Sequence, residues 1–294
     1  MAKFYSDLNL FVEWRQSLHE KKLHHNANLL PPALAIAVTH SITAQLPQCT
    51  EAEDIARALG CPYWPRSEGS LEDFAAAHTL DVLVVVGRHD IALWAHGHYL
   101  RYHPNAAALR IINLTRGRGD TLNELMQLEP GDRVLDCTCG LGADAISAAH
   151  SVGERGHVLA LEASPLLALL ARRGMATYQH PTTAAITLAM RRVYIKNERY
   201  QDLLPSLADH SFDIVYFDPM FRQTIDLANG LDLVRSFAQA GGPSPGDIQQ
   251  ARRVARRYVI MKDRMPGRAL SELGFSLVKK SRRFGYGLIE CTTQ

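Results

Sequence analysis

The sequence predicts an α/β fold in which a mostly parallel sheet ends in an antiparallel last strand and follows a smaller α/β subdomain. Three observations lead to this prediction. Apolar runs of strand length alternate with helical segments between residues 133 and 218, which is typical of βαβ units. The first of these runs is followed by a glycine-containing turn of the kind that joins a parallel strand to its helix. Two apolar runs near the end of the chain favour an antiparallel pair.

The first hundred residues carry signals for helices and strands of the smaller subdomain. Thr50 and Ser70 each precede an acidic residue by three positions, the capping-box pattern that opens a helix. Apolar runs bounded by turn residues predict strands at 35–38, 81–86 and 91–95.

A break at His103-Pro104-Asn105 is expected to divide the chain, because proline disfavours helical backbone in the residue before it. The predicted division is an N-terminal extension at 1–34, the smaller subdomain at 35–104 and the main domain at 105–294.

The main domain is expected to begin with a helix at 106–114, and Asp120 is expected to cap the next helix. The apolar runs then predict the strands and helices of the rest of the chain. Strands are predicted at 133–136, 157–162, 192–195, 212–218, 258–261, 275–279 and 287–291, and helices at 143–150, 165–178, 226–240, 244–253 and 267–273.

The composition excludes several classes of protein. With 47% hydrophobic and 21% charged residues, the 294-residue chain is typical of a globular protein. It has no apolar run long enough to span a membrane and no apolar signal core at its start, so we expect a cytoplasmic protein without a membrane partner. Its five cysteines contain no CxxC pair, and its histidine pairs lack a third ligand, so neither disulfides nor a metal site are expected.

The net charge of +2 conceals an uneven distribution. From residue 250 to the end, eleven lysines and arginines face three acidic residues. Such a basic region is either an electrostatic footprint for nucleic acid or a solvated helix face with protected strand edges. Charge alone leaves both interpretations open.

The turn after the first parallel strand predicts a cofactor site. The strand ends in Asp136, and Gly140 and Gly142 precede a helix, which lets the backbone approach a ligand closely. The next strand ends in Glu162, twenty residues after Gly142, where an acid can accept hydrogen bonds from two ribose hydroxyls. The pattern favours a nucleoside-containing cofactor over a merely tight turn.

Two such cofactors come into consideration. A nicotinamide dinucleotide would suit the glycines, with Ala145 as the third small residue. It does not need an acid before them, however, whereas Asp136 suits the ammonium group of a bound amino acid. The combination therefore favours S-adenosyl-L-methionine (SAM).

A second motif follows the strand at 212–218. Asp218 and the carbonyl of Pro219 can both accept hydrogen bonds from an amino group, and Phe221 can stack on a planar base. The carboxyl ends of parallel strands share one edge of the sheet, so Asp218 is expected beside the cofactor turn. The alternative is a strand-ending turn with a buried phenylalanine.

Together these motifs resemble a known family. Asp218-Pro219-Met220-Phe221 resembles the Asp/Asn-Pro-Pro-Tyr/Phe motif of amino-group methyltransferases, with Met220 in place of the second proline. With the Asp-x-Thr-x-Gly-Leu-Gly-x-Asp run at 136–144, the chain is similar to the 16S ribosomal RNA (guanine-N2) methyltransferase J family over residues 105–291. Residues 35–104 look closer to a related bacterial branch of uncharacterised SAM methyltransferases.

The resemblance implies a Rossmann-like class I methyltransferase and a set of site residues. One departure is Ala143, which stands where the family has an arginine. Implied cofactor contacts, with those of the turn itself, are Asp136, Thr138, Gly140, Gly142, Ala143, Asp144, Glu162, Ala163, Arg199, Tyr200 and Asp218. Catalysis is expected from Asp218, Pro219 and Phe221, and substrate contacts from Asn105, Met220 and Lys262.

The expected activity is SAM-dependent methyl transfer to an exocyclic amine of a nucleic-acid base. The resemblance implies guanine in ribosomal RNA, with that RNA or the small ribosomal subunit as partner. Two alternatives stay open: a methyltransferase for a small-molecule or protein amine, and a non-catalytic RNA-binding protein. A catalytic thiol at Cys137 or Cys139 would sit in the cofactor turn rather than opposite the methyl group.

Overall fold

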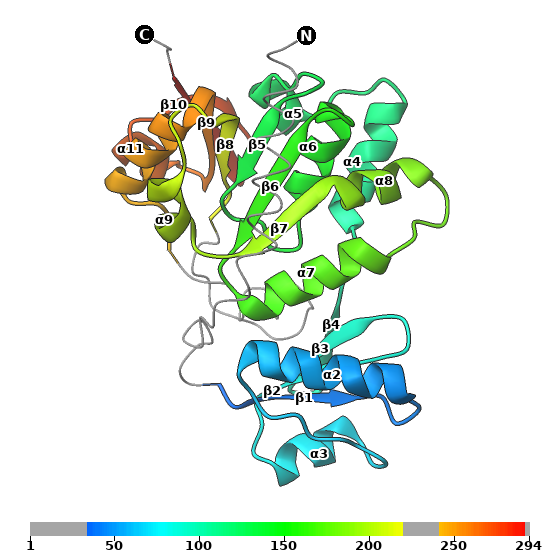
Figure 1. Cartoon of the computed structure of the whole chain (residues 1–294). Coiled ribbons are helices and arrows are strands. Elements are labelled where there is room, and N and C mark those ends of the chain that lie inside the picture. Colours follow the sequence, from blue (N-terminus) through cyan, green and yellow to red (C-terminus); the bar gives the residue numbers. More distant parts are fainter. Residues whose placement is uncertain (1–33, 220–240, 292–294) are drawn as a thin grey trace.

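The computed structural model describes residues 34–219 and 241–291, which form two sheets. Figure 1 shows the larger sheet with its helices above and the smaller sheet below, with one helix, α7, between them. Within the described residues the larger sheet has seven strands in the order β10-β11-β9-β8-β5-β6-β7. The smaller has four, in the order β1-β2-β3-β4.

The larger sheet confirms the predicted α/β fold. Its first five strands along the chain are parallel, whereas β11 is antiparallel to both of its neighbours, β9 and β10. The strands are β5 (Arg133–Asp136), β6 (His157–Glu162), β7 (Val193–Asn197), β8 (Phe212–Phe217), β9 (Ala255–Arg264), β10 (Ser276–Lys280) and β11 (Phe284–Glu290).

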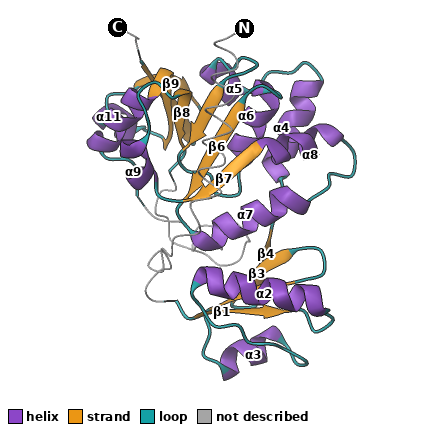
Figure 2. Ribbon diagram, viewed as in Figure 1, coloured by secondary structure: helices purple, strands orange, loops and turns teal. Residues whose placement is uncertain are grey.

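Helices cover both faces of the larger sheet, as Figure 2 shows. Each face buries its own apolar cluster, because successive strand residues point to opposite sides. On one face lie α4 (Asn105–Thr115), α5 (Thr121–Met126), α6 (Ala143–Val152), α7 (Pro165–Thr177) and α8 (Ala184–Arg192). On the other lie α9 (Tyr200–Leu203), the 3-10 turn Leu204–Ser206, α11 (Pro245–Val254) and α12 (Arg268–Glu272).

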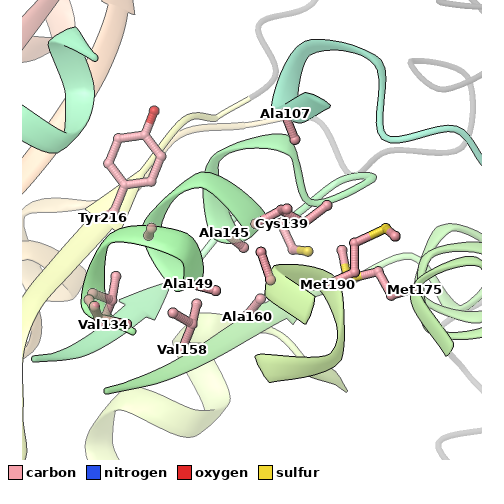
Figure 3. Close-up of a cluster of buried hydrophobic side chains, with 14 of the residues drawn as sticks. Ala107, Val134, Cys139, Ala145, Ala149, Val158, Ala160, Met175, Met190 and Tyr216 are labelled. Atoms are coloured by element: carbon pink, nitrogen blue, oxygen red, sulfur yellow. The ribbon is translucent and has the colours of Figure 1, made fainter. Parts of the chain in front are cut away.

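Small side chains let α6 lie close to the strands that it follows. Ala145 and Ala149 belong to the same buried cluster as Val134, Val158 and Ala160 (Figure 3). All five are at most 2% exposed. Dense packing here fixes the start of α6, and with it the turn that carries the predicted cofactor site.

The smaller sheet is packed between two helices and shares a third with the larger sheet. Its strands are β1 (Ile36–His40), β2 (Val82–Val86), β3 (Ile91–Ala95) and β4 (His98–Arg101). Side chains of α2 (Leu46–Leu59) pack on one face and those of α3 (Leu71–Ala77) on the other. Leu166, Leu167 and Leu170 of α7 join the core on the α2 face, and Arg173 forms an ion pair with Glu51 of α2 at 2.8 Å.

Several predicted elements differ from the observed ones. Helix α2 begins at Leu46 rather than near Thr50, because Gln45 and Gln48 exchange side-chain and backbone hydrogen bonds there. The Ser70 and Asp120 caps are confirmed by bonds from the N–H groups of Asp73 and Asn123 (3.0 Å each). Strand β4 and helix α8 were not predicted.

The predicted helix at 226–240 and the extension at 1–34 lie outside the described residues, apart from Leu34 at the start of the first described segment. The division at 104 stays a prediction, since α7 packs against both sheets. In the described part of the chain, no helix is long and apolar enough to cross a membrane.

Truncating a buried leucine of α7 should destabilise the protein. Leu167 is fully buried (0% exposed), so Leu167→Ala leaves a cavity and is expected to lower the free energy of unfolding by about 2–5 kcal/mol. Leu188→Ala on α8 removes the same atoms from a side chain that is 55% exposed and should cost under about 0.5 kcal/mol. Urea denaturation of both variants measures the difference, and equal losses would contradict the shared core.

Candidate active site at the carboxyl edge of the larger sheet

Hydrogen bonds join the turn after β5 to the end of β8. Asp136 Oδ1 accepts from the backbone N–H of Thr138 (3.0 Å), and Thr138 Oγ1 accepts from the backbone N–H of Asp218 (2.6 Å). Asp136 is only 2% exposed, and burial, followed by repulsion from nearby carboxylates, raises its pKa well above the usual value. An ammonium group beside Asp136 would favour its charged form, so the position fits the amino-acid end of SAM.

The two glycines of the turn have different roles. Both have positive φ angles, +55° at Gly140 and +83° at Gly142, which most side chains disfavour. A Cβ at Gly142 would lie 2.0 Å from Met175 Cε of α7, so this glycine permits close packing. A Cβ at Gly140 would meet no atom within 4 Å and would instead fill the space beside the turn. That space is where a ligand can approach the backbone.

Glu162 holds the turn in place at the end of β6. Its carboxylate accepts hydrogen bonds from the N–H groups of Gly140 (2.7 Å) and Ser164 (2.8 Å). Burial raises the pKa of Glu162, and these N–H bonds partly offset the rise. A carboxylate offers about four acceptor positions, so each oxygen keeps one for a ribose hydroxyl. The arrangement therefore fits the ribose of SAM.

Asp144 is held by side chains from two other elements. Its carboxylate accepts from Arg110 on α4, and from the hydroxyl of Tyr216 on β8 at 3.0 Å. Arg110 also makes two bonds to Asp120, of 2.6 and 2.8 Å. Where the resembled family has an arginine next to this acid, the chain has Ala143, and Arg110 brings a guanidinium to Asp144 from α4 instead.

Asp218 forms an ion pair with Lys262 at the end of β9. Lys262 Nζ donates to Asp218 Oδ2 at 2.7 Å, and the two side chains stay 25% and 30% exposed. Burial raises the pKa of Asp218, although the ammonium of Lys262 opposes the rise. Burial alone would lower the pKa of Lys262, but the carboxylates of Asp218 and Asp144 outweigh it and raise that pKa. The pair lies at the rim of the site, where each group favours the charged form of the other.

The remaining predicted residues lie around this centre. Ala143 is the first residue of α6, and the carbonyl of Ala163 accepts from Asn197 Nδ2 at 3.2 Å. Arg199 precedes α9, while the ring of Tyr200 packs edge-on against Phe217 in the core, 5.3 Å between centroids. The ring of Tyr200 is therefore part of the core, and its predicted contact with the cofactor stays a prediction.

Of four further residues predicted for catalysis or substrate binding, two lie within the described part of the chain and two lie outside it. Pro219 is buried directly after Asp218, and Asn105 is the first residue of α4. Met220 and Phe221 lie outside the described residues, so their predicted roles stay predictions.

Sequence reasoning missed three residues that organise the site: Arg110, Tyr216 and Asn197. Asn197 Nδ2 donates to the carbonyl of Glu162 at 2.8 Å and fixes the end of β6 against β7. Its position at the end of a strand is a signal that the sequence did carry. Arg110 and Tyr216 reach Asp144 from 34 and 72 residues away, and no local pattern marks such contacts. Among the described residues, no group of acidic, histidine or cysteine side chains could hold a metal ion.

The chain that carries Asp136, Glu162 and Asp218 at one edge of its sheet is similar to known methyltransferases. A family model described as "Putative SAM-dependent methyltransferase" matches residues 97–286. The uncharacterized protein YpiP of Bacillus subtilis (strain 168) is 34% identical over 241 residues, which cover 81% of this chain and 93% of YpiP. The chain belongs to this family of SAM-dependent methyltransferases.

Two other similarities differ in extent. The solved structure of a SAM-dependent methyltransferase from Neisseria gonorrhoeae covers 86% of this chain and 95% of its own, with a TM-score of 0.57 at 17% identity. It supports the class I methyltransferase fold. The 23S rRNA (uracil(1939)-C(5))-methyltransferase RlmD of Acinetobacter baumannii (strain AB0057) is 51% identical over 41 residues, only 14% of this chain and 9% of RlmD. This methyltransferase is therefore an enzyme that uses SAM, while the narrower resemblance to the guanine-N2 family is not confirmed.

Glu162→Gln should weaken the binding of SAM. The amide keeps the size of the side chain but puts an NH₂ group against the N–H of either Gly140 or Ser164, and it removes an acceptor for the ribose. We expect SAM affinity, measured by calorimetry, to fall at least about tenfold. Glu154→Gln changes an exposed acid in the turn after α6 and should bind SAM as the wild type does. Equal affinities of the two variants would contradict the assignment.

Proposed function

We propose that this methyltransferase transfers the methyl group of SAM to an exocyclic amine of a nucleic-acid base, with guanine in ribosomal RNA as the favoured target. The observation that carries the proposal is the position of Asp218-Pro219. Its carboxylate and its carbonyl follow β8, and the backbone of Asp218 is bonded to the cofactor turn through Thr138 at 2.6 Å.

The proposed chemistry depends on orientation. SAM supplies a methyl group that is already activated by its positive sulfur. Asp218 and the Pro219 carbonyl accept the two N–H bonds of an amine, which directs the nitrogen lone pair away from both oxygens. Asp136 and Glu162 hold the two ends of the cofactor, and Phe221 stacks on the base. The ammonium of Lys262 opposes the rise in the pKa of Asp218 and so favours its ionised, accepting form.

The choice of nucleic acid over another amine rests on charge and resemblance. The last 45 residues carry eleven lysines and arginines against three acids, which suits a phosphate backbone. The amine motif resembles that of the guanine-N2 family, and the short match to RlmD concerns a protein named for ribosomal RNA. The proposed partner is therefore ribosomal RNA or the small ribosomal subunit.

Methyl transfer to carbon 5 of a base, with a cysteine of the cofactor turn as the nucleophile, has less support than transfer to an amine. Cys137 and Cys139 are 4% and 7% exposed. Burial raises the pKa of both thiols well above the usual value, so neither is poised as a thiolate nucleophile.

Replacing Asp218 tests the base-amine mechanism. Purified protein with tritiated SAM is offered total RNA, small ribosomal subunits, genomic DNA and a metabolite extract. We expect label in ribosomal RNA, reduced about 100-fold by Asp218→Ala and less by Asp218→Asn, which keeps one acceptor oxygen. The control variant Asp209→Ala removes an exposed acid that pairs with Arg253, and it should leave labelling unchanged.

Other outcomes would contradict the proposal in distinct ways. Label that enters only small molecules or protein would replace the nucleic-acid substrate by another amine. RNA labelling that Asp218→Ala leaves intact would show that the carboxylate does not orient the acceptor.

Lys262→Met should shift the pH dependence of methyl transfer. Burial raises the pKa of Asp218 and Lys262 opposes that rise, so without the ammonium the carboxylate protonates at higher pH. The acidic limb of kcat/KM is expected to move to higher pH in the variant. Arg57→Met removes a cation that pairs with Asp54 on α2, beside the smaller sheet, and should leave that limb in place. Superimposable pH profiles would exclude the electrostatic role of Lys262.

A further inference from the structure

The basic residues of the C-terminal region divide between the two edges of the larger sheet. Arg253 donates to the carbonyls of Leu204 (2.9 Å) and Leu207 (2.7 Å). Arg256 lies 3.8 Å from Asp213, and Arg257 pairs with Asp132. Asp213 and Asp132 lie at the starts of β8 and β5, so Arg256 and Arg257 are bound at the edge of the sheet opposite to Asp218.

The β10–β11 hairpin lies at the same edge as Asp218. Because β11 is antiparallel to β9, its first residues lie beside the last residues of β9, with Phe284 opposite Arg264 and Tyr286 opposite Lys262. The turn between β10 and β11 therefore projects from the carboxyl edge of the sheet. Residues 273–289 contain no acid. Their four cations are all exposed and form no ion pair with an acid at 34–219 or 241–291: Lys279, Lys280, Arg282 and Arg283.

An aromatic side chain connects this basic turn to the catalytic carboxylate. Phe284 is 37% exposed, and its ring meets that of Tyr286 edge-on, 5.9 Å between centroids. Lys262 Nζ lies 5.0 Å from the Phe284 ring centroid while it donates to Asp218. Residues opposite each other in antiparallel strands share a face, so Lys279, Tyr286 and Lys262 form one row that leads toward Asp218.

We propose that the β10–β11 hairpin is the docking surface for a single-stranded nucleic-acid segment, with one base stacked on Phe284 and the neighbouring phosphates held by Lys279, Lys280, Arg282 and Arg283. This inference rests on the proposed function and narrows its substrate to an unpaired segment next to the target nucleotide. An exposed aromatic ring among cations is the combination that binds single strands, because unpaired bases offer a free face and their phosphates attract positive charge. Bases inside a duplex are already stacked on each other.

Binding measured apart from catalysis tests the stacking contact. The probe is a fluorescein-labelled single-stranded RNA of about 12 nucleotides and mixed sequence, followed by anisotropy with the full chain and without SAM. Phe284→Ala should weaken binding roughly tenfold, because loss of a base–aromatic stack has about that effect. Phe284→Leu keeps an apolar side chain but no aromatic face and should be weakened as well. Tyr99→Ala removes an aromatic side chain that is 48% exposed on β4 and should bind normally.

The salt dependence tests the phosphate contacts. Lys279→Gln with Lys280→Gln should lower the slope of log affinity against log salt by about 1.4, or 0.7 per phosphate contact on a single strand. The control, Arg88→Gln with Arg155→Gln, removes two exposed arginines away from the hairpin and should keep the wild-type slope. The Phe284 variants should also keep that slope, since stacking releases no counterions.

The outcomes separate this proposal from the proposed function. Unchanged RNA affinity in Phe284→Ala and in the double lysine variant would overturn the docking surface, even if the wild type methylates RNA. A duplex of the same sequence that binds as well as the single strand would overturn it too. RNA binding that depends on the hairpin residues, without methylation of any base, would support the docking surface and contradict the base-amine reaction. SAM affinity equal to that of the wild type shows that each variant is folded.

Discussion

The short hydrogen bond from the Asp218 N–H to Thr138 Oγ1 is the contact on which the site depends. The β5–β8 ladder reaches only to Asp136 and Tyr216, and the backbone bond from Cys137 to Tyr216 extends it by one step. The Thr138 side chain adds the next step after both strands have ended. The turn that fits SAM and the carboxylate proposed to orient the amine are thereby held in one register, so neither can shift along its strand without the other.

The sequence was sufficient to predict elements whose signals are local. Strands β5 and β6 were predicted with their observed bounds, because each is an apolar run closed by a turn and an acid. Helix α8 (residues 184–192) was missed although Thr183 caps it through a hydrogen bond from the Ala185 N–H (3.3 Å), because no acid or glutamine at 186 completes a capping-box pattern. Helix α2 begins earlier than predicted, because glutamine side chains replace the Thr50 capping box. Local propensity was overridden there by other polar groups able to make the same bonds.

The site was predictable as far as strand ends determine it. Asp136, Glu162 and Asp218 meet at one edge because parallel strands end there, a rule that needs only the order of apolar runs. The ion pair between Asp218 and Lys262 joins residues 44 positions apart on neighbouring strands, and its existence depends on register. The charge count had a similar limit. It gives eleven cations in the last 45 residues. It does not show that Arg256 and Arg257 bind acids at the opposite edge of the sheet.

Helix α7 gives the fold a thermodynamic property that neither sheet has alone. It starts next to Glu162, whose carboxylate binds the N–H of Ser164, and its leucines complete the core of the smaller sheet while Ala168 and Met175 complete that of the larger. A ligand that binds the native state at Glu162 therefore shifts the unfolding equilibrium of both sheets together. With SAM bound at Glu162 as proposed, the smaller sheet would be stabilised together with the larger one, and loss of the cofactor would destabilise both.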